Sequence, residues 1–253
     1  MRAAGILEKT VPFAASVSQA ACSGCGLKRL CMPIALSYPE MEGLDAMIGA
    51  PRRLKRGRYL YRTGDPFKAI YVVRAGFFKT GVLRSNGQEQ VAGFQMVGEL
   101  LGLDGISNEV HSCDAVALED SQVCLIPFGE LEALACGIPA LQRHFHKLMS
   151  REIVRDQGVM MLLGTLRAEG RLAAFLLNLS QRFAVRGYSP TDFHLRMTRD
   201  EIGSYLGLHL GTVSHAFSRF QEEGLVAVHL KHIQILDVGR LKSAMGRAGH
   251  HYS

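Results

Sequence analysis

The sequence predicts an α+β chain with an N-terminal antiparallel β-roll, a long helix and a C-terminal winged helix-turn-helix. Residues 51–130 hold short alternating apolar stretches interrupted by glycine, a pattern typical of an antiparallel barrel or jelly roll. Residues 141–166 lack proline and repeat apolar side chains at helical spacing. The last third alternates amphipathic helices with tight turns and ends in two short strands.

Length and composition bound the domain organisation. The 253 residues are 47% hydrophobic, enough for about two domains, and contain no apolar run of about 18 residues that could cross a membrane. The N-terminus has no sustained apolar stretch of the kind a secretion signal needs, so we expect a cytoplasmic protein with reduced thiols and no membrane partner. We expect four parts: a cysteine-rich segment over 1–37, the β-roll over 38–140, the long helix over 141–167 and the winged helix-turn-helix over 168–253.

The cysteines are unevenly distributed. Three lie within ten residues, at Cys22, Cys25 and Cys31. The others are isolated and far downstream, at Cys113, Cys124 and Cys136. Soft thiolates suit zinc, copper(I) and iron–sulfur centres, and C-x2-C-x5-C spacing lets three sulfurs converge on one inorganic group whose fourth ligand comes from a distant strand. No second C-x2-C or histidine pair accompanies them, which favours an iron–sulfur centre and leaves zinc and redox-active thiols as alternatives.

Within the β-roll, Asn86-Gly87 separates two alternating runs. This dipeptide predicts a type I′ hairpin, because both central residues of that turn need a positive φ.

The long helix carries an apolar seam with steps of three, four or seven residues, which predicts a coiled-coil-like dimer interface. Its apolar members are Phe145, Met149, Ile153, Met160 and Leu163. Asp156 lies between Ile153 and Met160, and in a parallel pair it would approach its own copy and oppose association. We interpret the seam as the interface of a marginal dimer; the alternative is that Asp156 lies on a solvated flank beside Arg151 or Arg155.

The C-terminal part follows the order of a winged helix-turn-helix. Thr198 is expected to cap a helix over 199–206, with Glu201 completing a capping box, and Gly207 to form the turn. A second helix over 210–223 would end at Gly224. The remaining expected elements are a helix over 171–183, a strand over 193–197 and a hairpin wing over 225–228 and 233–236; the buried stripe of the second helix is expected at Val213, Phe217 and Phe220.

Charge favours nucleic acid as the partner of this part. The net charge is +6, and the sequence from Arg167 onward contains eleven Lys or Arg but only seven Asp or Glu. The start of the second helix would enter the major groove of double-stranded DNA. We expect base contacts from Gly211, Ser214 and His215, and phosphate contacts from Thr198, Arg199, Thr212, Arg219 and Lys231. The alternative is a winged helix that contacts another protein.

The chain resembles the FNR branch of the CRP/FNR family of bacterial transcription regulators over nearly its whole length. The motifs that carry this resemblance are the C-x2-C-x5-C segment with Pro33, the glycine-punctuated roll, 123–128, Glu152-Ile153, Asp156-Gln157, 171–175, Met197-Thr198-Arg199 and Gly207-Leu208. The resemblance implies a [4Fe-4S] cluster on Cys22, Cys25, Cys31 and Cys124, and identifies Asp156 as the repulsive interface residue.

The resemblance also implies how the regulator works. The intact cluster would favour a homodimer that binds a palindromic operator and works with RNA polymerase, as an activator, under anaerobic conditions. Oxygen would convert the cluster to [2Fe-2S] and return the chain to a monomer.

Two departures qualify these expectations. The stretch from Gly98 to Asp114 contains no Lys or Arg to neutralise a phosphate, so we expect no cyclic nucleotide in the jelly roll. Gly211 and His215 stand where related recognition helices carry glutamate and arginine, which predicts an altered operator preference.

No enzymatic motif is present. The remaining alternative is a related DNA-binding regulator gated by zinc, thiols or a small ligand.

Overall fold

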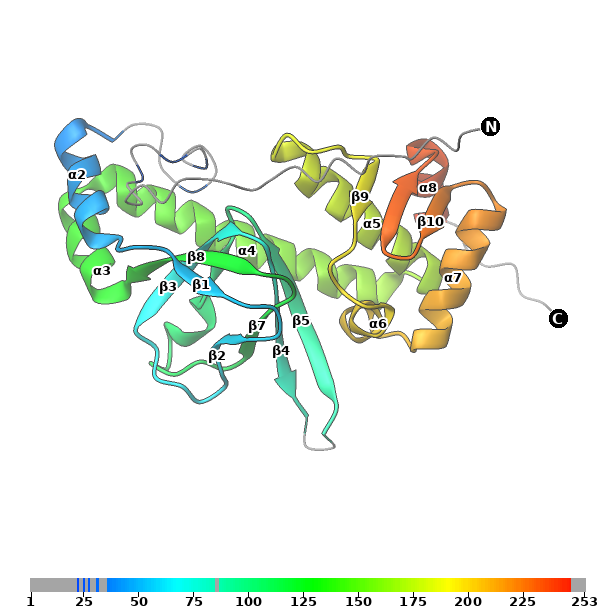
Figure 1. Ribbon diagram of the computed structural model, residues 1–253, viewed down its shortest axis with the longest axis horizontal. Coiled ribbons are helices and arrows are strands. Elements are labelled where there is room, and N and C mark those ends of the chain that lie inside the picture. The colour runs from blue at the N-terminus through cyan, green and yellow to red at the C-terminus, as the bar shows by residue number, and fades with distance from the viewer. Residues whose placement is uncertain are drawn as a thin grey trace, which may run out of the picture.

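The computed structural model describes Cys22, Cys25, Leu27, Cys31, residues 36–84 and residues 87–246 (Figure 1). Pro33 and Asn86 lie outside the described residues. Next to Asn86, Gly87 has φ 78°, and its amide donates to the carbonyl oxygen of Arg84 at 2.9 Å. The amide of Arg84 donates in turn to the carbonyl of Gln88, so a tight reversal connects the two flanking strands.

The predicted β-roll is confirmed as two four-stranded sheets in the orders β1-β8-β3-β6 and β2-β7-β4-β5. Every strand pair in them is antiparallel. The strands are β1 Arg52–Leu54, β2 Tyr59–Tyr61, β3 Ala69–Ala75, β4 Phe77–Leu83, β5 Glu89–Met96, β6 Leu100–Leu101, β7 Asp114–Ala117 and β8 Ser121–Pro127, with a short 3-10 helix η2 at Leu103–Gly105.

Strand β3 shows how the roll is covered on both faces. Successive side chains of a strand point to opposite faces. Tyr71 and Val73 pack between the two sheets, whereas Ile70 and Val72 pack against the surrounding helices. The strand therefore has nearly continuous burial instead of the alternation of a half-exposed sheet.

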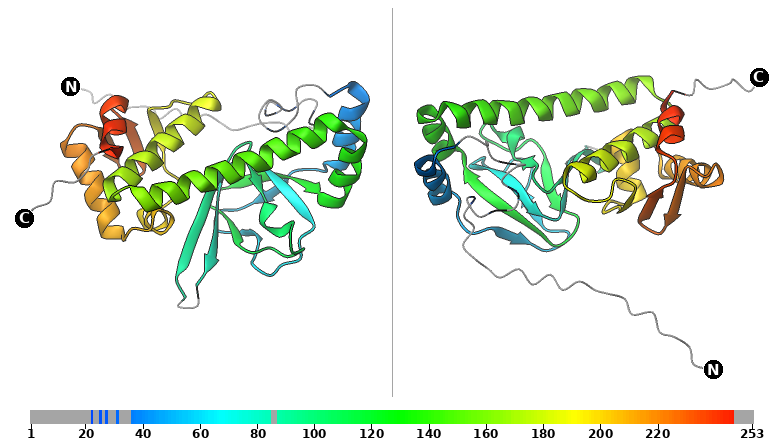
Figure 2. Two further views of the ribbon diagram at one scale, coloured as in Figure 1. Left: turned by 180° about the vertical axis from the view of Figure 1, so that it is seen from behind. Right: turned by 90° about the horizontal axis from the view of Figure 1, so that it is seen from above.

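Three helices cover the outer face of the β3–β8 pair: α2 Tyr38–Met47, α3 Phe128–Gly137 and the start of α4 Pro139–Thr165. Helix α4 has 27 residues, hence a length of about 40 Å, and runs past both the roll and the C-terminal domain (Figure 2). It begins two residues before the predicted start, because proline is tolerated in the first turn of a helix.

The predicted winged helix-turn-helix is also confirmed. Its elements are α5 Ala168–Val185, β9 Asp192–His194, α6 Arg199–Leu206, α7 Leu210–Glu222, β10 Val226–His229, β11 His232–Ile235 and α8 Val238–Met245, with the sheet order β10-β11-β9. Gly207 and Gly224 end α6 and α7 with φ 63° and 65°. The strand predicted over 193–197 is wrong at its end, since pairing with β11 stops at His194 and the chain then turns into α6. Helix α8 was not predicted.

The C-terminal domain shares an apolar core with the roll. Phe77 of β4 and Val91, Phe94 and Met96 of β5 pack in one cluster with the buried residues of α5, α6 and α7. The outer face of the β4–β5 pair therefore serves as a platform for the winged helix. None of the helices in the described ranges has the length and apolar content that crossing a membrane requires.

Candidate functional site

The strand period of β8 places Cys124 on the outer face of the roll. Val123 is buried between the sheets, while Cys124 and Ile126 pack on the opposite side with the helices. Cys22 and Cys31 belong to the same apolar cluster. The local turns of the N-terminal segment include an amide of Cys25 that donates to the carbonyl of Cys22 at 3.2 Å.

These cysteines border a common cavity of about 50 Å³. All four predicted ligand cysteines line it, together with Arg74, His144 and apolar side chains of α2, α4 and the strands. Cys113 and Cys136 lie elsewhere: Cys113 packs at the core between the sheets, and Cys136 is exposed on α3. The fold thus brings together the same four thiols that the resemblance selected.

The environment of these thiols is apolar. Burial, together with the neighbouring Cys31, Cys124, Asp45 and Cys25, raises the pKa of Cys22 to about 12. Burial also raises the pKa of Cys31 to about 12, with contributions from Cys25 and Cys124. All three of the other thiols contribute to the raised pKa of Cys22, in agreement with their common position at the cavity. Thiols in such surroundings are poor nucleophiles, because the thiolate is the reactive form.

The donor set suits a sulfur-ligated group. In the described part of the chain, no group of three or more His, Cys, Asp or Glu side chains is arranged to hold a single metal ion. Four thiols around one apolar cavity match the ligand set of an iron–sulfur cluster, in which each cysteine binds a different iron atom. Arg74 hydrogen-bonds to the Cys124 side chain and places a positive charge beside it.

Two residues of the stretch from Gly98 to Asp114, which lacks Lys and Arg, have partners elsewhere in the chain. His111 is only 3% exposed, stacks on the ring of Tyr61 at a centroid distance of 3.6 Å and contacts a carboxylate oxygen of Asp104 at 3.4 Å. Glu99, which follows the Gly98 turn, is engaged by arginines of other elements.

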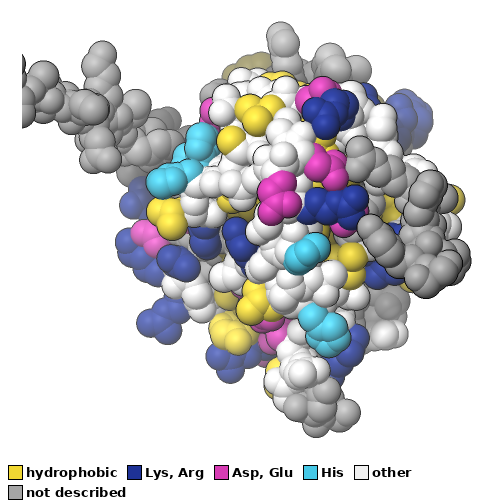
Figure 3. Space-filling view, turned by 90° about the vertical axis from the view of Figure 1, so that its right-hand side faces the viewer, with side chains coloured by type: hydrophobic (Ala, Val, Ile, Leu, Met, Phe, Trp, Pro, Cys, Tyr) yellow, Lys and Arg dark blue, Asp and Glu magenta, His cyan; other side chains and the backbone are white. Residues whose placement is uncertain are grey.

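The predicted base-contacting residues lie on the open side of α7. Gly211 and His215 are exposed and Ser214 is half-buried, whereas Val213 and Phe217 are buried as predicted. A Cβ added to Gly211 would meet no atom within 4 Å, so this position has open space around it. Figure 3, which views the molecule from the C-terminal-domain end, shows basic and histidine side chains spread over this end.

Two predicted phosphate contacts are organised by the first turn of α6. The hydroxyl of Thr198 accepts from the amide of Glu201 at 3.1 Å, and a carboxylate oxygen of Glu201 accepts from the amide of Thr198 at 2.7 Å. This is the predicted capping box. Arg199 lies over the ring of Phe217 at 5.3 Å from its centroid. Thr212 is exposed one residue beyond Gly211.

The other two basic residues have partners within the chain. Arg219 forms ion pairs with Glu169 at 2.6 Å and Glu223 at 2.9 Å. Lys231 donates to the carbonyl of Arg196 at 3.1 Å. Either side chain would have to exchange these partners to contact a phosphate.

Helix α4 presents large apolar side chains to solvent. Ile153 and Met160 of the predicted seam are 58% and 74% exposed, while Met149 and Leu163 are half-buried. Val154 and Met161 extend this exposed stripe, although they are not among the predicted seam residues.

The other two residues of the predicted seam are Phe145 and Asp156. The prediction that Phe145 belongs to the dimer seam is wrong, because its side chain turns inward and packs near Phe128. Asp156 is exposed, and no ion pair links it to a basic side chain in the described ranges. Its neighbour Arg155 pairs with Glu152 and Glu99 instead.

Comparison with known proteins places this architecture. Residues 51–135 match the model of the cyclic nucleotide-binding domain, and residues 170–244 match that of the Crp-like helix-turn-helix domain. The transcriptional regulatory protein Btr of Bordetella pertussis is 46% identical over 241 residues, which cover 95% of this chain and 99% of that protein. This chain belongs to the CRP/FNR family of transcription regulators.

Further relatives agree with this assignment. The transcriptional activator protein Anr of Pseudomonas aeruginosa is 45% identical over 88% of this chain and 91% of that protein. The fumarate and nitrate reduction regulatory protein of Salmonella typhi is 42% identical, over 89% and 90% respectively. The structure of FixK2 from Bradyrhizobium japonicum superposes with a TM-score of 0.71 at 30% identity, covering 79% of this chain and 98% of that one. The chain is therefore a DNA-binding transcription regulator and not an enzyme.

Proposed function

We propose that this CRP/FNR-family regulator responds to oxygen through a [4Fe-4S] cluster held by Cys22, Cys25, Cys31 and Cys124. When bound, such a cluster supplies an oxygen-sensitive centre that is converted to [2Fe-2S]. The observation that supports this proposal is that four of the six cysteines, drawn from the N-terminal segment and from β8, border one apolar cavity. Four cysteine thiolates are the usual protein ligands of a [4Fe-4S] cluster.

The cationic residue of this cavity also fits the cluster. Four thiolates on a [4Fe-4S]²⁺ core leave about two net negative charges, which are costly in an apolar environment. Arg74 lines the cavity and hydrogen-bonds to Cys124, so its guanidinium can offset part of that charge without ligating iron.

Helix α4 connects the cavity with the proposed dimer interface. Leu141, Phe145 and Leu148 line the cavity from the first half of α4, and the exposed stripe begins at Ile153, in the second half of the same helix. An ordered cluster segment would fix these first turns against the roll and hold the remainder of the helix straight. Exposed apolar side chains such as Ile153 and Met160 would then be buried against a second copy.

We propose that the cluster-loaded chain is a homodimer and that the chain without the cluster is a monomer. Two charges of Asp156 opposed across the seam make the dimer marginal, so the additional stabilisation from the cluster segment decides the state. The dimer would bind a palindromic operator, since two recognition helices related by a two-fold axis require two inverted half-sites.

The proposed DNA contacts follow from the exposed surface of the helix-turn-helix. Gly211, Ser214 and His215 would face base edges from α7. The proposed phosphate contacts come from side chains around the starts of α6 and α7 and the end of α7: Thr198, Arg199, Thr212 and Arg219. We further propose RNA polymerase as a partner and the cytoplasm as the location, in agreement with the transcription-regulator family.

Cysteine replacement tests the proposal. Serine at Cys22, Cys25, Cys31 or Cys124 should abolish the brown colour, iron and acid-labile sulfide of anaerobically isolated protein. Serine at Cys113 or Cys136 is the matched control and should leave all three unchanged, because these thiols lie away from the cavity. A colourless wild-type protein that contains zinc, or colour that survives loss of any of the four cysteines, would contradict the proposal.

A further inference from the structure

Glu99 lies where the roll, α4 and the C-terminal domain meet. It follows the left-handed Gly98, between β5 and β6, and one of its carboxylate oxygens accepts from the amide of Met96 at 3.0 Å. Its side chain is only 12% exposed. A carboxylate fixed to its own turn in this way has one defined direction in which to bind partners.

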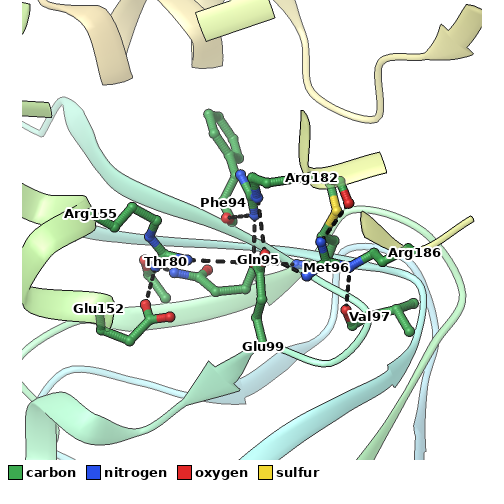
Figure 4. Close-up of polar contacts among 10 residues, drawn as sticks. All are labelled: Thr80, Phe94, Gln95, Met96, Val97, Glu99, Glu152, Arg155, Arg182 and Arg186. Atoms are coloured by element: carbon green, nitrogen blue, oxygen red, sulfur yellow. Dashed lines mark hydrogen bonds and ion pairs between the residues drawn. The ribbon is translucent and has the colours of Figure 1, made fainter. Parts of the chain in front are cut away.

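Three arginines, one in α4, one in α5 and one directly after α5, converge on this carboxylate (Figure 4). Arg182 of α5 binds both of its oxygens, with Nε at 3.0 Å from Oε1. Arg186, the residue that directly follows α5, places Nη2 at 2.7 Å from Oε1. Arg155 of α4 reaches Oε2 at 3.5 Å. Glu99 is thus the common acceptor of three cations from outside the roll.

Arg182 of α5 and Arg186, which directly follows that helix, also bind the roll directly. Arg182 donates to the carbonyl of Phe94 at 2.6 Å, and Arg186 donates to the carbonyl of Val97 at 2.5 Å. Such charge-assisted bonds to carbonyls and a carboxylate are directional, in contrast to the apolar contacts beside them. They define how α5 is rotated on the roll as well as how close it lies.

A second polar attachment holds α6. Lys79 of β4 pairs with Glu201 of α6 at 2.9 Å, and the amide of Val91 on β5 donates to the hydroxyl of Ser204 at 2.9 Å. The same hydroxyl donates to the carbonyl of Glu89 at 2.9 Å. Because the two attachments involve different helices, they remove the rotation that a single attachment point would allow.

The rotation of this domain determines where α7 points. Helices α5, α6 and α7 pack against one another as well as against β4 and β5, so a change in how α5 and α6 lie on these strands would carry α7 with it. A dimer can contact two half-sites only if its recognition helices are separated by about one turn of DNA, which is about 34 Å. A small rotation of each domain on its roll would misplace both helices together.

We propose that Glu99 is a positioning residue for operator binding, which fixes the orientation of the winged helix on the roll and on α4. It contacts no DNA itself and acts through Arg155, Arg182 and Arg186. Burial raises the pKa of Glu99, but Arg182 and the other two arginines lower it more, so the carboxylate is ionised at neutral pH. The inference rests on DNA binding by this family and does not require the cluster.

The test compares Glu99→Gln with the parent protein in the same anaerobic preparation. Glutamine keeps the shape of the side chain and removes the charge that three arginines share. We expect operator affinity, measured by fluorescence anisotropy, to fall by about 5- to 150-fold, the usual range for coupling between distant sites. Iron content and dimer mass should stay at the parental values, because Glu99 lies outside the cysteine cavity and the exposed stripe.

A distance measurement separates positioning from general destabilisation. Probes are introduced as non-natural amino acids at Glu132 on α3 and Gln221 on α7, both of which are exposed. The distribution of distances between them, measured without DNA, should broaden in Glu99→Gln. It should narrow again in Glu99→Asp, which retains the carboxylate. Asp120→Asn is the control, since it removes a carboxylate from an exposed ion pair with Lys55 on the same roll and should change neither readout.

Parental affinity in Glu99→Gln, or a loss of affinity with an unchanged distance distribution, would overturn the proposal. Should Glu99→Gln fail to fold, Arg186→Lys examines the same attachment. Lysine keeps the positive charge but has one nitrogen in place of the separate Nε and Nη2 that bind the Val97 carbonyl and the Glu99 carboxylate, so affinity should again fall and the distribution broaden. An Arg186→Lys protein with the parental values of both would refute it equally.

Discussion

Replacement of Asp156 by alanine should convert the protein to a dimer in air, without any iron. In the structure Asp156 is exposed beside Ile153 and Met160, and Arg155, the nearest basic neighbour in sequence, is committed to Glu99 and Glu152. Its charge would therefore enter the dimer seam without a partner from its own helix. Alanine removes that charge and retains good helix propensity.

The size of the effect follows from Coulomb's law. Two like charges about 6 Å apart repel by about 0.7 kcal/mol at the dielectric constant of water, and by about 3 kcal/mol at an effective value of about 20. In the proposed dimer the flanking side chains of Ile153 and Met160, which are exposed in the single chain, would exclude water from the seam, which favours the larger value. The dimer dissociation constant should then fall by up to about 100-fold, since each 1.4 kcal/mol is a factor of ten.

Light scattering of aerobically purified protein over a range of concentrations measures this constant. Asp156→Asn should behave like Asp156→Ala if charge is the cause, because it keeps the shape of the side chain. Glu132→Ala, which removes an exposed carboxylate from α3, serves as the control and should leave the protein monomeric. An Asp156→Ala protein that stays monomeric in air at the concentrations where the anaerobic parent is a dimer would refute the charge-seam explanation.

The remaining predictions concern the DNA-binding part and pH. Selection from random DNA should return an operator other than the ordinary FNR palindrome, and Gly211→Glu with His215→Arg should restore that palindrome, because each base contact gives about 1–3 kcal/mol of discrimination and Gly211 has space for a side chain. Thr198→Ala should lower the free energy of unfolding by about 1 kcal/mol through loss of the cap, and Thr198→Ser should not. The pKa of Glu99 is lower in the folded protein than in the unfolded chain, so its carboxylate stabilises the fold at pH values above the unfolded-state pKa. This stabilisation is lost as the pH falls through the folded-state pKa. The free energy of unfolding of Glu99→Gln, measured by chemical denaturation, should therefore change less with acidic pH than that of the parent.

Local sequence signals predicted the helix-turn-helix almost residue by residue. The bounds of α6, its capping box and the glycine turn at Gly207 depend on neighbouring residues, so they can be predicted without the rest of the chain. The end of β9 could not be, because it depends on where β11 stops pairing. The position of Cys124 could be predicted only in part. The alternation of side chains along a strand places Cys124 and Val123 on opposite faces, but the sequence does not indicate which face meets the helices.

Long-range polar contacts escaped prediction altogether. Glu99 and Arg182 are 83 positions apart, and neither belongs to a recognisable local motif. The stripe on α4 was predicted too narrowly, since a strict heptad seam omits Val154 and Met161, which lie on the same exposed side. Phe145 fits the heptad spacing, but its side chain packs beside Phe128 in the core that covers the roll.

The most direct measurement is the molar mass of freshly isolated, air-free protein, determined together with its iron and acid-labile sulfide before and after the cluster is removed by oxygen. We predict iron and sulfide in the air-free sample and a dimer that dissociates to monomers as both are lost. A sample that lacks iron and sulfide, or a dimer of unchanged mass and operator affinity after their removal, would contradict the proposal that a cluster bound to these four cysteines controls assembly.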